Sequence, residues 1–136
     1  MRWTITVPGE PRGKGRPRFS RQSGRTYTPR ETEVYENLIR LAFENEHPGH
    51  FPAESDLSIE ILAVFQIPRS WSKKKQQAAI GRPCRKKPDF DNIAKAVCDA
   101  LNGVAYRDDA QIADAHVRKI YGEIPRVEIV LEELIE

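Results

Sequence analysis

Aspartates are concentrated in one short stretch in the second half of the chain. Asp89 and Asp91 stand two residues apart, and Asp108 and Asp109 follow as an adjacent pair. Carboxylates held close together repel one another unless a cation neutralises them. A few carboxylates with open water positions make a typical Mg²⁺ site, and a metal held there can polarise an oxygen and activate water. These residue types and spacings therefore indicate a divalent-metal site.

A helix expected over residues 91–101 would bring a lysine among these carboxylates. At 100° per residue, Lys95 and Asp99 fall within about 80° of Asp91, so the three side chains share one face. Asp89 lies just before the helix, where the macrodipole favours a carboxylate. The opposite face is apolar and is expected to pack on a core; it carries Ala94, Val97, Cys98 and Leu101.

A purely structural interpretation of this face stays open. Asp91 could be only a helix cap, and Asp91, Lys95 and Asp99 could form an exposed ladder of i,i+4 ion pairs, worth a few tenths of a kcal/mol each. This structural interpretation does not explain why Asp89 and Asp91 follow directly on a basic segment, or why a second acidic pair comes after a glycine turn.

The net charge of +2 conceals two basic segments. Residues 1–30 hold eight basic side chains against one acidic (+7), and residues 69–87 hold eight against none (+8), so the remainder carries −13. Side chains of like charge within each segment repel one another. This favours the interpretation that the segments bind an anionic partner over the interpretation that they are merely solvated loops.

The 136 residues suit one compact domain spanning 1–136, of the α/β class. We expect a mixed sheet of about four strands, two main helices and long basic loops. Predicted strands cover 2–7, 57–67 (a central strand), 115–121 and 126–131, the last two joined as a hairpin by the turn at 122–125. Predicted helices cover 73–80, 91–101 and a segment that ends at 47–49.

That last helix has clear start and stop signals. Thr28 followed by Pro29, with Glu31 three residues after Thr28, predicts a capping box and a first-turn proline. Its main apolar positions recur at helical spacing, joined by Tyr35, Ile39 and Phe43; they are Val34, Leu38, Leu41 and Ala42. Residues 8–27, rich in Gly, Pro and Arg, predict a long mobile loop before it.

Composition excludes several classes of protein. Hydrophobic residues at 39% support a real core, and no apolar run approaches the about 20 residues of a membrane span. With no signal-peptide pattern we expect a cytoplasmic protein, and with no glycine-rich cradle, no nucleotide cofactor. A zinc site would have to combine His47, His50, Cys84 and Cys98, whose spacing is irregular. His116 is more readily a satisfied histidine than a site residue.

Residues 89–111 resemble the signature of the RusA family of Holliday junction resolvases, and in particular its phage-type members. The run reads D-x-D-N-x-x-K-x-x-x-D-x-L from Asp89, followed by D-D-x-Q from Asp108. Residues 14–19 and 25–29 are also similar to the N-terminal region of many members. The similarity is loose only over residues 46–88.

This resemblance implies roles for individual residues. Asp89, Asp91 and Asp109 correspond to the metal-binding carboxylates, and Lys95 to the catalytic lysine. Asp99 and Asp108 match family positions and could orient Lys95 or a metal-bound water. The implied cofactor is Mg²⁺, for which Mn²⁺ could substitute.

The resemblance also implies branched DNA as the substrate. A four-way junction has two-fold symmetry, so a homodimer making paired symmetric nicks, with 5′-phosphate and 3′-hydroxyl ends, is expected. Phe19 and Trp71 could act as wedges between bases, although Trp71 could equally pack on the core. The alternative is a non-catalytic basic DNA-binding module. The candidate DNA-binding residues are Arg12, Lys14, Arg16, Arg18, Arg21, Arg25, Lys73, Lys74, Lys75, Arg85, Lys86 and Lys87.

Overall fold

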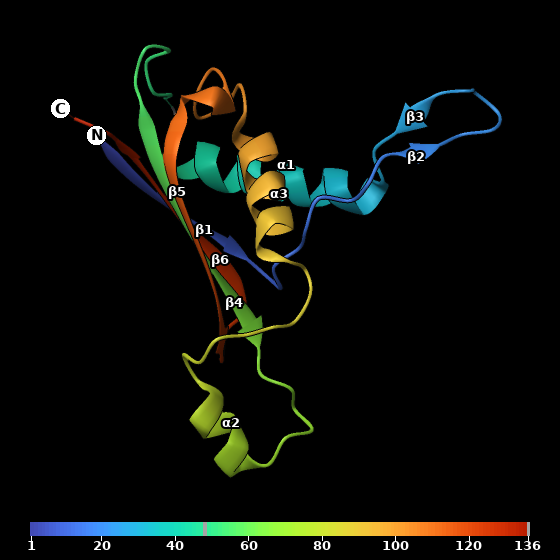
Figure 1. Cartoon of the computed structure of the whole chain (residues 1–136), viewed down its shortest axis with the longest axis vertical. Coiled ribbons are helices and arrows are strands. Elements are labelled where there is room, and N and C mark those ends of the chain that lie inside the picture. The colour runs from blue at the N-terminus through green and yellow to red at the C-terminus, as the bar shows by residue number, and fades with distance from the viewer. Residues whose placement is uncertain (48, 136) are drawn as a thin grey trace.

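Figure 1 shows the computed structural model, which describes residues 1–47 and 49–135. Four strands form one mixed sheet in the order β1-β6-β4-β5, in which β4 and β5 are parallel and the other neighbours antiparallel. The prediction of one small α/β domain with a mixed four-stranded sheet is confirmed. The strands are β1 (Arg2–Pro8), β4 (Leu57–Gln66), β5 (Ile112–Gly122) and β6 (Arg126–Glu133).

Two helices, α1 (Arg30–Glu46) and α3 (Phe90–Leu101), cover one face of this sheet (Figure 1). Their apolar side chains meet the inward residues of the strands, and Phe43, Leu101 and Ile129 are almost wholly buried. Burial of each such side chain contributes about 1.5–3 kcal/mol, so the core fixes how both helices lie on the sheet. No helix in the described residues has the length and apolar character needed to cross a membrane.

The start of α1 differs from the prediction. Pro29 is the N-cap, and no side chain caps the helix, so the capping box predicted for Thr28 and Glu31 is wrong. The helix ends at Glu46 with His47 as its C-cap, close to the predicted stop; Pro48 of that stop signal lies outside the described residues.

The buried face of α1 also differs. Tyr35, Ile39 and Phe43, which recur every four residues, form the row that packs on the sheet, whereas Val34 and Leu41 are exposed. Both rows have helical spacing. The row with two aromatic rings buries more apolar area, and this decides which side faces the core.

The predicted hairpin between the last two strands is wrong. β5 and β6 do not pair with each other, because β4 lies between them and pairs with both. β4 is the most apolar strand, and the centre of the sheet buries it best. The turn at 122–125 must therefore span two strand spacings, roughly 10 Å, which four residues can do.

The predicted loop over residues 8–27 contains a small hairpin. β2 (Arg18–Phe19) and β3 (Thr26–Tyr27) pair antiparallel, and the hairpin projects away from the domain (Figure 1). Gly24 has φ +67 in its turn, a conformation that glycine adopts without steric cost. We call residues 16–28 the arm.

The second basic segment lies at a different place in the fold. Helix α2 (Lys73–Ala79) has Ser72 as its N-cap, whose hydroxyl accepts a hydrogen bond from the Lys75 N–H at 3.2 Å. Figure 1 shows α2 beyond the end of β4, far from the arm. The two basic segments therefore lie at separate places on the molecule.

Candidate active site

Helix α3 presents the predicted chemical face to solvent. Asp89 is its N-cap and Asp91 lies in its first turn, and both are exposed. The buried face holds the helix against the sheet and α1, so its rotation is fixed by packing; this face consists of Ile93, Ala96, Val97, Ala100 and Leu101.

Lys95 pairs with Asp99, one turn further along the helix. The distance from Lys95 Nζ to Asp99 Oδ2 is 3.7 Å, and the Lys95 side chain is 62% exposed. An exposed pair of this length contributes little to stability, typically about 0.3–0.5 kcal/mol. The structural interpretation therefore accounts for a weak contact to Asp99, and it leaves the ammonium group accessible from solvent.

The second acidic pair lies in the loop that follows α3. The Asp108 carboxylate accepts a hydrogen bond from the Ala110 N–H at 3.1 Å and forms a capping box with Gln111 around the short 3₁₀ helix η1 (Asp109–Gln111). Partial burial and then the neighbouring carboxylates of Asp108 and Asp99 raise the pKa of Asp109, while Lys95 opposes the rise. Asp109 is therefore near enough to Asp99 and Lys95 for their charges to act on it.

Asp89 has a different environment at the other end of α3. Its Oδ1 accepts a hydrogen bond from Lys87 Nζ at 2.7 Å. This bond, together with the charges of Lys87 and Lys119, holds the pKa of Asp89 below its ordinary value, although desolvation opposes it. Asp89 is thus ionised and balanced by cations, whereas Asp109 lies among other carboxylates.

The donors have the chemistry that a magnesium ion requires, since all are carboxylates. The neighbouring carboxylates of Asp108 and Asp99 raise the pKa of Asp109, and a cation bound there would relieve this repulsion. Their geometry is incomplete: among residues 1–47 and 49–135, no three His, Cys, Asp or Glu side chains lie close enough to hold a metal ion together. A site that uses Asp89, Asp91 and Asp109 requires these carboxylates to approach one another.

Tyr106 ties the acidic loop to the helix. Its ring is 1% exposed, and its hydroxyl donates a hydrogen bond to the Cys98 carbonyl at 2.7 Å. The sequence pattern did not single out this residue. Its burial two residues before Asp108 explains how the loop is held beside α3.

Replacing Tyr106 with phenylalanine is expected to lower the free energy of unfolding by about 1 kcal/mol, because the hydrogen bond is lost while the ring stays in place. Urea denaturation of the purified protein measures this. Tyr27→Phe is the matched control, because the Tyr27 side chain is 50% exposed, and it should change stability by less than about 0.5 kcal/mol. Equal effects of the two substitutions would contradict this role of Tyr106.

An open groove of about 780 Å³ connects the basic segments with the start of α3. Arg12, Arg16 and Arg18 line one part of it, and Lys87, Asp89 and Asn92 line another. The N-terminal segment is pinned there by a backbone hydrogen bond from Lys14 N–H to the Asn92 carbonyl at 3.1 Å. Residues more than 70 positions apart thus form one surface, in which arginines and Lys87 lie together with the carboxylates of Glu31 and Asp89.

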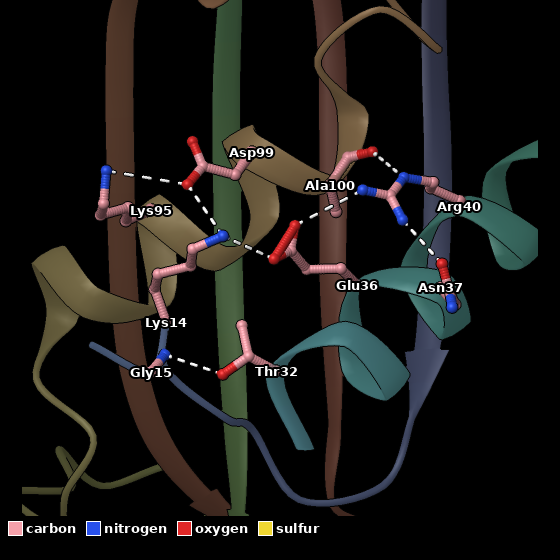
Figure 2. A network of polar contacts seen from close by, with 9 residues as sticks. All are labelled: Lys14, Gly15, Thr32, Glu36, Asn37, Arg40, Lys95, Asp99 and Ala100. Carbon is pink, nitrogen blue, oxygen red and sulfur yellow. Dashed lines mark hydrogen bonds and ion pairs between the residues drawn. The ribbon is translucent and has the colours of Figure 1, made fainter. Parts of the chain in front are cut away.

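A partly buried charged network involves Lys14 of the same N-terminal segment (Figure 2). Lys14 Nζ lies 2.6 Å from Glu36 Oε1 and 3.4 Å from Asp99 Oδ2, and its side chain is only 19% exposed. Sequence patterns predicted Lys14 as one of many DNA-binding cations and did not identify Glu36, which lies on the buried face of α1. The sole sequence signal that could have identified Glu36 is its position, because it is a carboxylate between Tyr35 and Ile39, two residues of the buried row of α1.

The aromatic side chains proposed as wedges have contrasting environments. Phe19, on the arm, is 64% exposed and contacts no core. Trp71 instead packs edge-on against Tyr121 at 5.5 Å between ring centroids, and Lys75 Nζ lies 4.0 Å from the Trp71 ring centroid. Phe19 is therefore the more accessible of the two. His116 lies on β5 in an exposed pair with Asp114 at 3.0 Å.

Comparison with known proteins identifies similar sequences. The family model described as "Endodeoxyribonuclease RusA" matches residues 8–132, nearly the whole chain. A curated relative from Bacillus subtilis (strain 168), described as "Uncharacterized protein YqaN", is 37% identical over 137 residues. The alignment covers 96% of this chain and 95% of the relative.

Proposed function

The chain belongs to the RusA family of endodeoxyribonucleases, and from this premise we propose that it resolves four-way DNA junctions by paired, metal-dependent nicks. Members of the family are metal-dependent nucleases, and the family implies Holliday junction resolvase activity on branched DNA. The ion, the residues that hold it and the assembly of the active enzyme are the finer parts of the proposal.

The observation that supports this function best is the groove beside α3. Its lining combines arginines of the N-terminal segment and Lys87 with the carboxylate of Asp89, so a DNA backbone held by these cations would pass beside the start of α3. A plain DNA-binding module has no need of exposed acidic groups along its phosphate path, because they repel the ligand. A carboxylate beside groove-lining cations suits a metal-dependent nuclease, in which a bound metal ion would act on the phosphate.

Asp89, Asp91 and Asp109 are the proposed metal-holding residues, and Mg²⁺ is the proposed ion. When bound, such an ion polarises a phosphate oxygen and orients a water for attack. The protein contributes the negative charge that attracts the cation, from an ionised Asp89 and from the acidic loop. Asp99 and Asp108 are proposed to orient the groups around this centre, as their hydrogen bonds and ion pairs allow.

Lys95 is the proposed catalytic lysine. Its ammonium is exposed on the same face of α3 as Asp91 and Asp99, and it interacts electrostatically with Asp109. Negative charge increases on the phosphate oxygens in the transition state of hydrolysis, and a cation placed there lowers the barrier. The loose pair with Asp99 leaves Lys95 able to make this contact.

The arm is proposed to bind the DNA backbone away from the cut. Replacing Arg21 and Arg25 together with glutamine is expected to weaken junction binding and to reduce the slope of log Kd against log salt by about two, since each lost phosphate contact removes about 0.9. Fluorescence anisotropy with a labelled junction at several salt concentrations measures both.

A matched control replaces two arginines that are already paired on the sheet. Arg2 lies 3.9 Å from Glu132, and Arg126 lies 3.3 Å from Glu128. Arg2→Gln with Arg126→Gln should leave the salt slope unchanged. A salt slope that is flat in the wild type, or one that the control pair reduces equally, would contradict the role of the arm.

The proposed active form is a homodimer. A four-way junction is two-fold symmetric, and two symmetric nicks require two sites related by the same symmetry. Analytical ultracentrifugation at assay concentrations should give a mass of twice 15.6 kDa. A monomer that still makes paired nicks would overturn this part.

The experiment that tests the function compares two labelled substrates of the same sequence, a synthetic four-way junction and its linear duplex, with and without Mg²⁺. Cleavage of the junction alone, and only with the ion, supports the proposal. Binding without cleavage would favour the non-catalytic module, and equal cleavage of both substrates would overturn junction selectivity.

A further inference from the structure

Lys14, in the N-terminal segment, is linked to the proposed catalytic lysine, Lys95, through the carboxylate of Asp99. Figure 2 shows Asp99 between them: its Oδ2 lies 3.4 Å from Lys14 Nζ and 3.7 Å from Lys95 Nζ. Lys14 and Lys95 are 81 positions apart in the chain. One carboxylate oxygen therefore serves two cations that come from different parts of the fold.

Lys14 is held at this place from several directions. Glu36, almost fully buried, contacts its ammonium at 2.6 Å, and the Lys14 N–H donates to the Asn92 carbonyl at 3.1 Å. The next residue, Gly15, donates its N–H to Thr32 Oγ1 at 3.0 Å, and a Cβ on Gly15 would overlap that oxygen. Backbone and side chain are thus fixed together.

The charge of Lys14 is also fixed. Burial favours the neutral amine, but the hydrogen bond and charge of Glu36, with those of Asp99, outweigh it and raise the pKa of Lys14 above its ordinary value. An ammonium that is 19% exposed and shared by two carboxylates is poorly available to a DNA phosphate. It differs in this from the arginines of the arm.

Glu36 has a second cation on its other side. Arg40 Nη2 lies 3.5 Å from Glu36 Oε2, while its remaining donors bond the Ala100 carbonyl and Asn37 Oδ1. Figure 2 shows Arg40 on the opposite side of Glu36 from Lys95. The chain offers a natural control here, because Arg40 shares the buried carboxylate of Glu36 without contacting Asp99.

We propose that Lys14 is a positioning residue for the reaction, held by Glu36, which shares the charge of Asp99 and so keeps Lys95 free to reach the scissile phosphate. The proposal rests on the proposed function of Lys95. Without Lys14, Asp99 has Lys95 as its nearest cation, and the loose contact would close into a tight pair. The lysine would then be drawn toward Asp99 and away from DNA.

The test measures junction cleavage by Lys14→Met under single-turnover conditions, with DNA affinity measured separately. The rate constant at saturating enzyme should fall about 10- to 100-fold, because a misplaced group costs that much, while Kd and its salt slope stay unchanged. Lys14→Arg should restore most of the rate because it restores the charge. A raised Kd with an unchanged rate would overturn the proposal and make Lys14 an ordinary DNA contact.

Two further variants separate positioning from folding. Lys14→Met leaves the buried Glu36 carboxylate without its closest cation, which could prevent folding. In that case the double variant Lys14→Met with Glu36→Gln removes both charges, and it should show the same loss of rate. Arg40→Gln is the matched control: it should lower the melting temperature and leave the rate of the folded enzyme unchanged. An equal loss of rate in Arg40→Gln would assign the network to folding alone.

A readout that needs no cleavage allows a failure of this inference to be distinguished from a failure of the proposed function. The ¹⁵Nζ resonance of Lys95 in the free protein should shift in Lys14→Met, as the contact to Asp99 tightens, and should stay in place in Arg40→Gln. An unchanged Lys95 resonance in Lys14→Met overturns the inference even if the wild type cleaves junctions. A wild type that never cleaves overturns the proposed function even if the resonance shifts.

Discussion

Replacing Asp91 with asparagine is expected to abolish metal-dependent cleavage, by about 10³-fold or more, while binding to a four-way junction survives. The amide has the size of the carboxylate and lacks its charge, so a metal ion is held poorly. Asp91 is exposed in the first turn of α3, and its loss should cost the fold less than about 1 kcal/mol through the helix dipole. Cleavage of a labelled junction and anisotropy with the same DNA measure the two effects.

The matched control is the same substitution at Asp114. This aspartate is exposed on β5, paired with His116 and not part of the proposed centre. Asp114→Asn should cleave within about twofold of the wild type. If Asp91→Asn cleaves as well as Asp114→Asn does, the carboxylate at the start of α3 has no catalytic role, and the assignment of the metal site is wrong.

Replacing Lys95 with methionine is expected to lower the cleavage rate by about 10²- to 10³-fold, the typical effect of removing one group that stabilises transition-state charge. Binding should change little, because a single exposed lysine is a small part of the charge that contacts DNA. Folding should also change little, since the pair with Asp99 is exposed and long. Single-turnover cleavage, Kd and a thermal melt measure the three quantities.

Lys95→Arg helps to interpret this result. Arginine keeps the charge but spreads it over a larger planar group, so it should recover part of the activity and not all of it. A loss of binding equal to the loss of rate in Lys95→Met would make Lys95 a DNA contact. An unchanged rate would leave only the structural interpretation, an ion pair with Asp99.

The fold was largely predictable where one periodicity dominated. Helix α3 has one apolar and one charged face, so both its position and its orientation followed from spacing. In α1 two apolar rows compete, and the buried row was decided by Tyr35 and Phe43 in contacts with distant strands. The pairing of β5 with β4 also depends on such contacts, because local turn residues favoured a hairpin with β6.

For the candidate site, the sequence predicted where the residues of α3 lie, but not how the loop that follows α3 lies beside them. Spacing alone predicted that Asp89 and Asp91 lie at the start of a helix and that Lys95 lies on the same face as Asp91. The influence of Asp99 and Lys95 on the pKa of Asp109 depends on the loop that Tyr106 anchors. Neither the motif nor the charge pattern indicated that Lys14 would be partly buried.

The role of Lys14 could not come from the sequence because its partners lie far away along the chain. Glu36 is 22 positions later, and Asp99 is on another helix. In a basic segment of +7, one lysine resembles its neighbours until the fold shows that it faces inward. Its surroundings separate it from the arm, whose hairpin projects away from the domain (Figure 1).

The most direct test of the whole account uses a supercoiled plasmid that extrudes a cruciform. If the protein is a junction resolvase with two symmetric sites, Mg²⁺ should yield linear plasmid cut at the base of the cruciform, with 5′-phosphate and 3′-hydroxyl ends that DNA ligase reseals. Asp91→Asn should leave the plasmid uncut. Equal cutting of a plasmid without the cruciform, or no cutting with any divalent ion, would contradict the account.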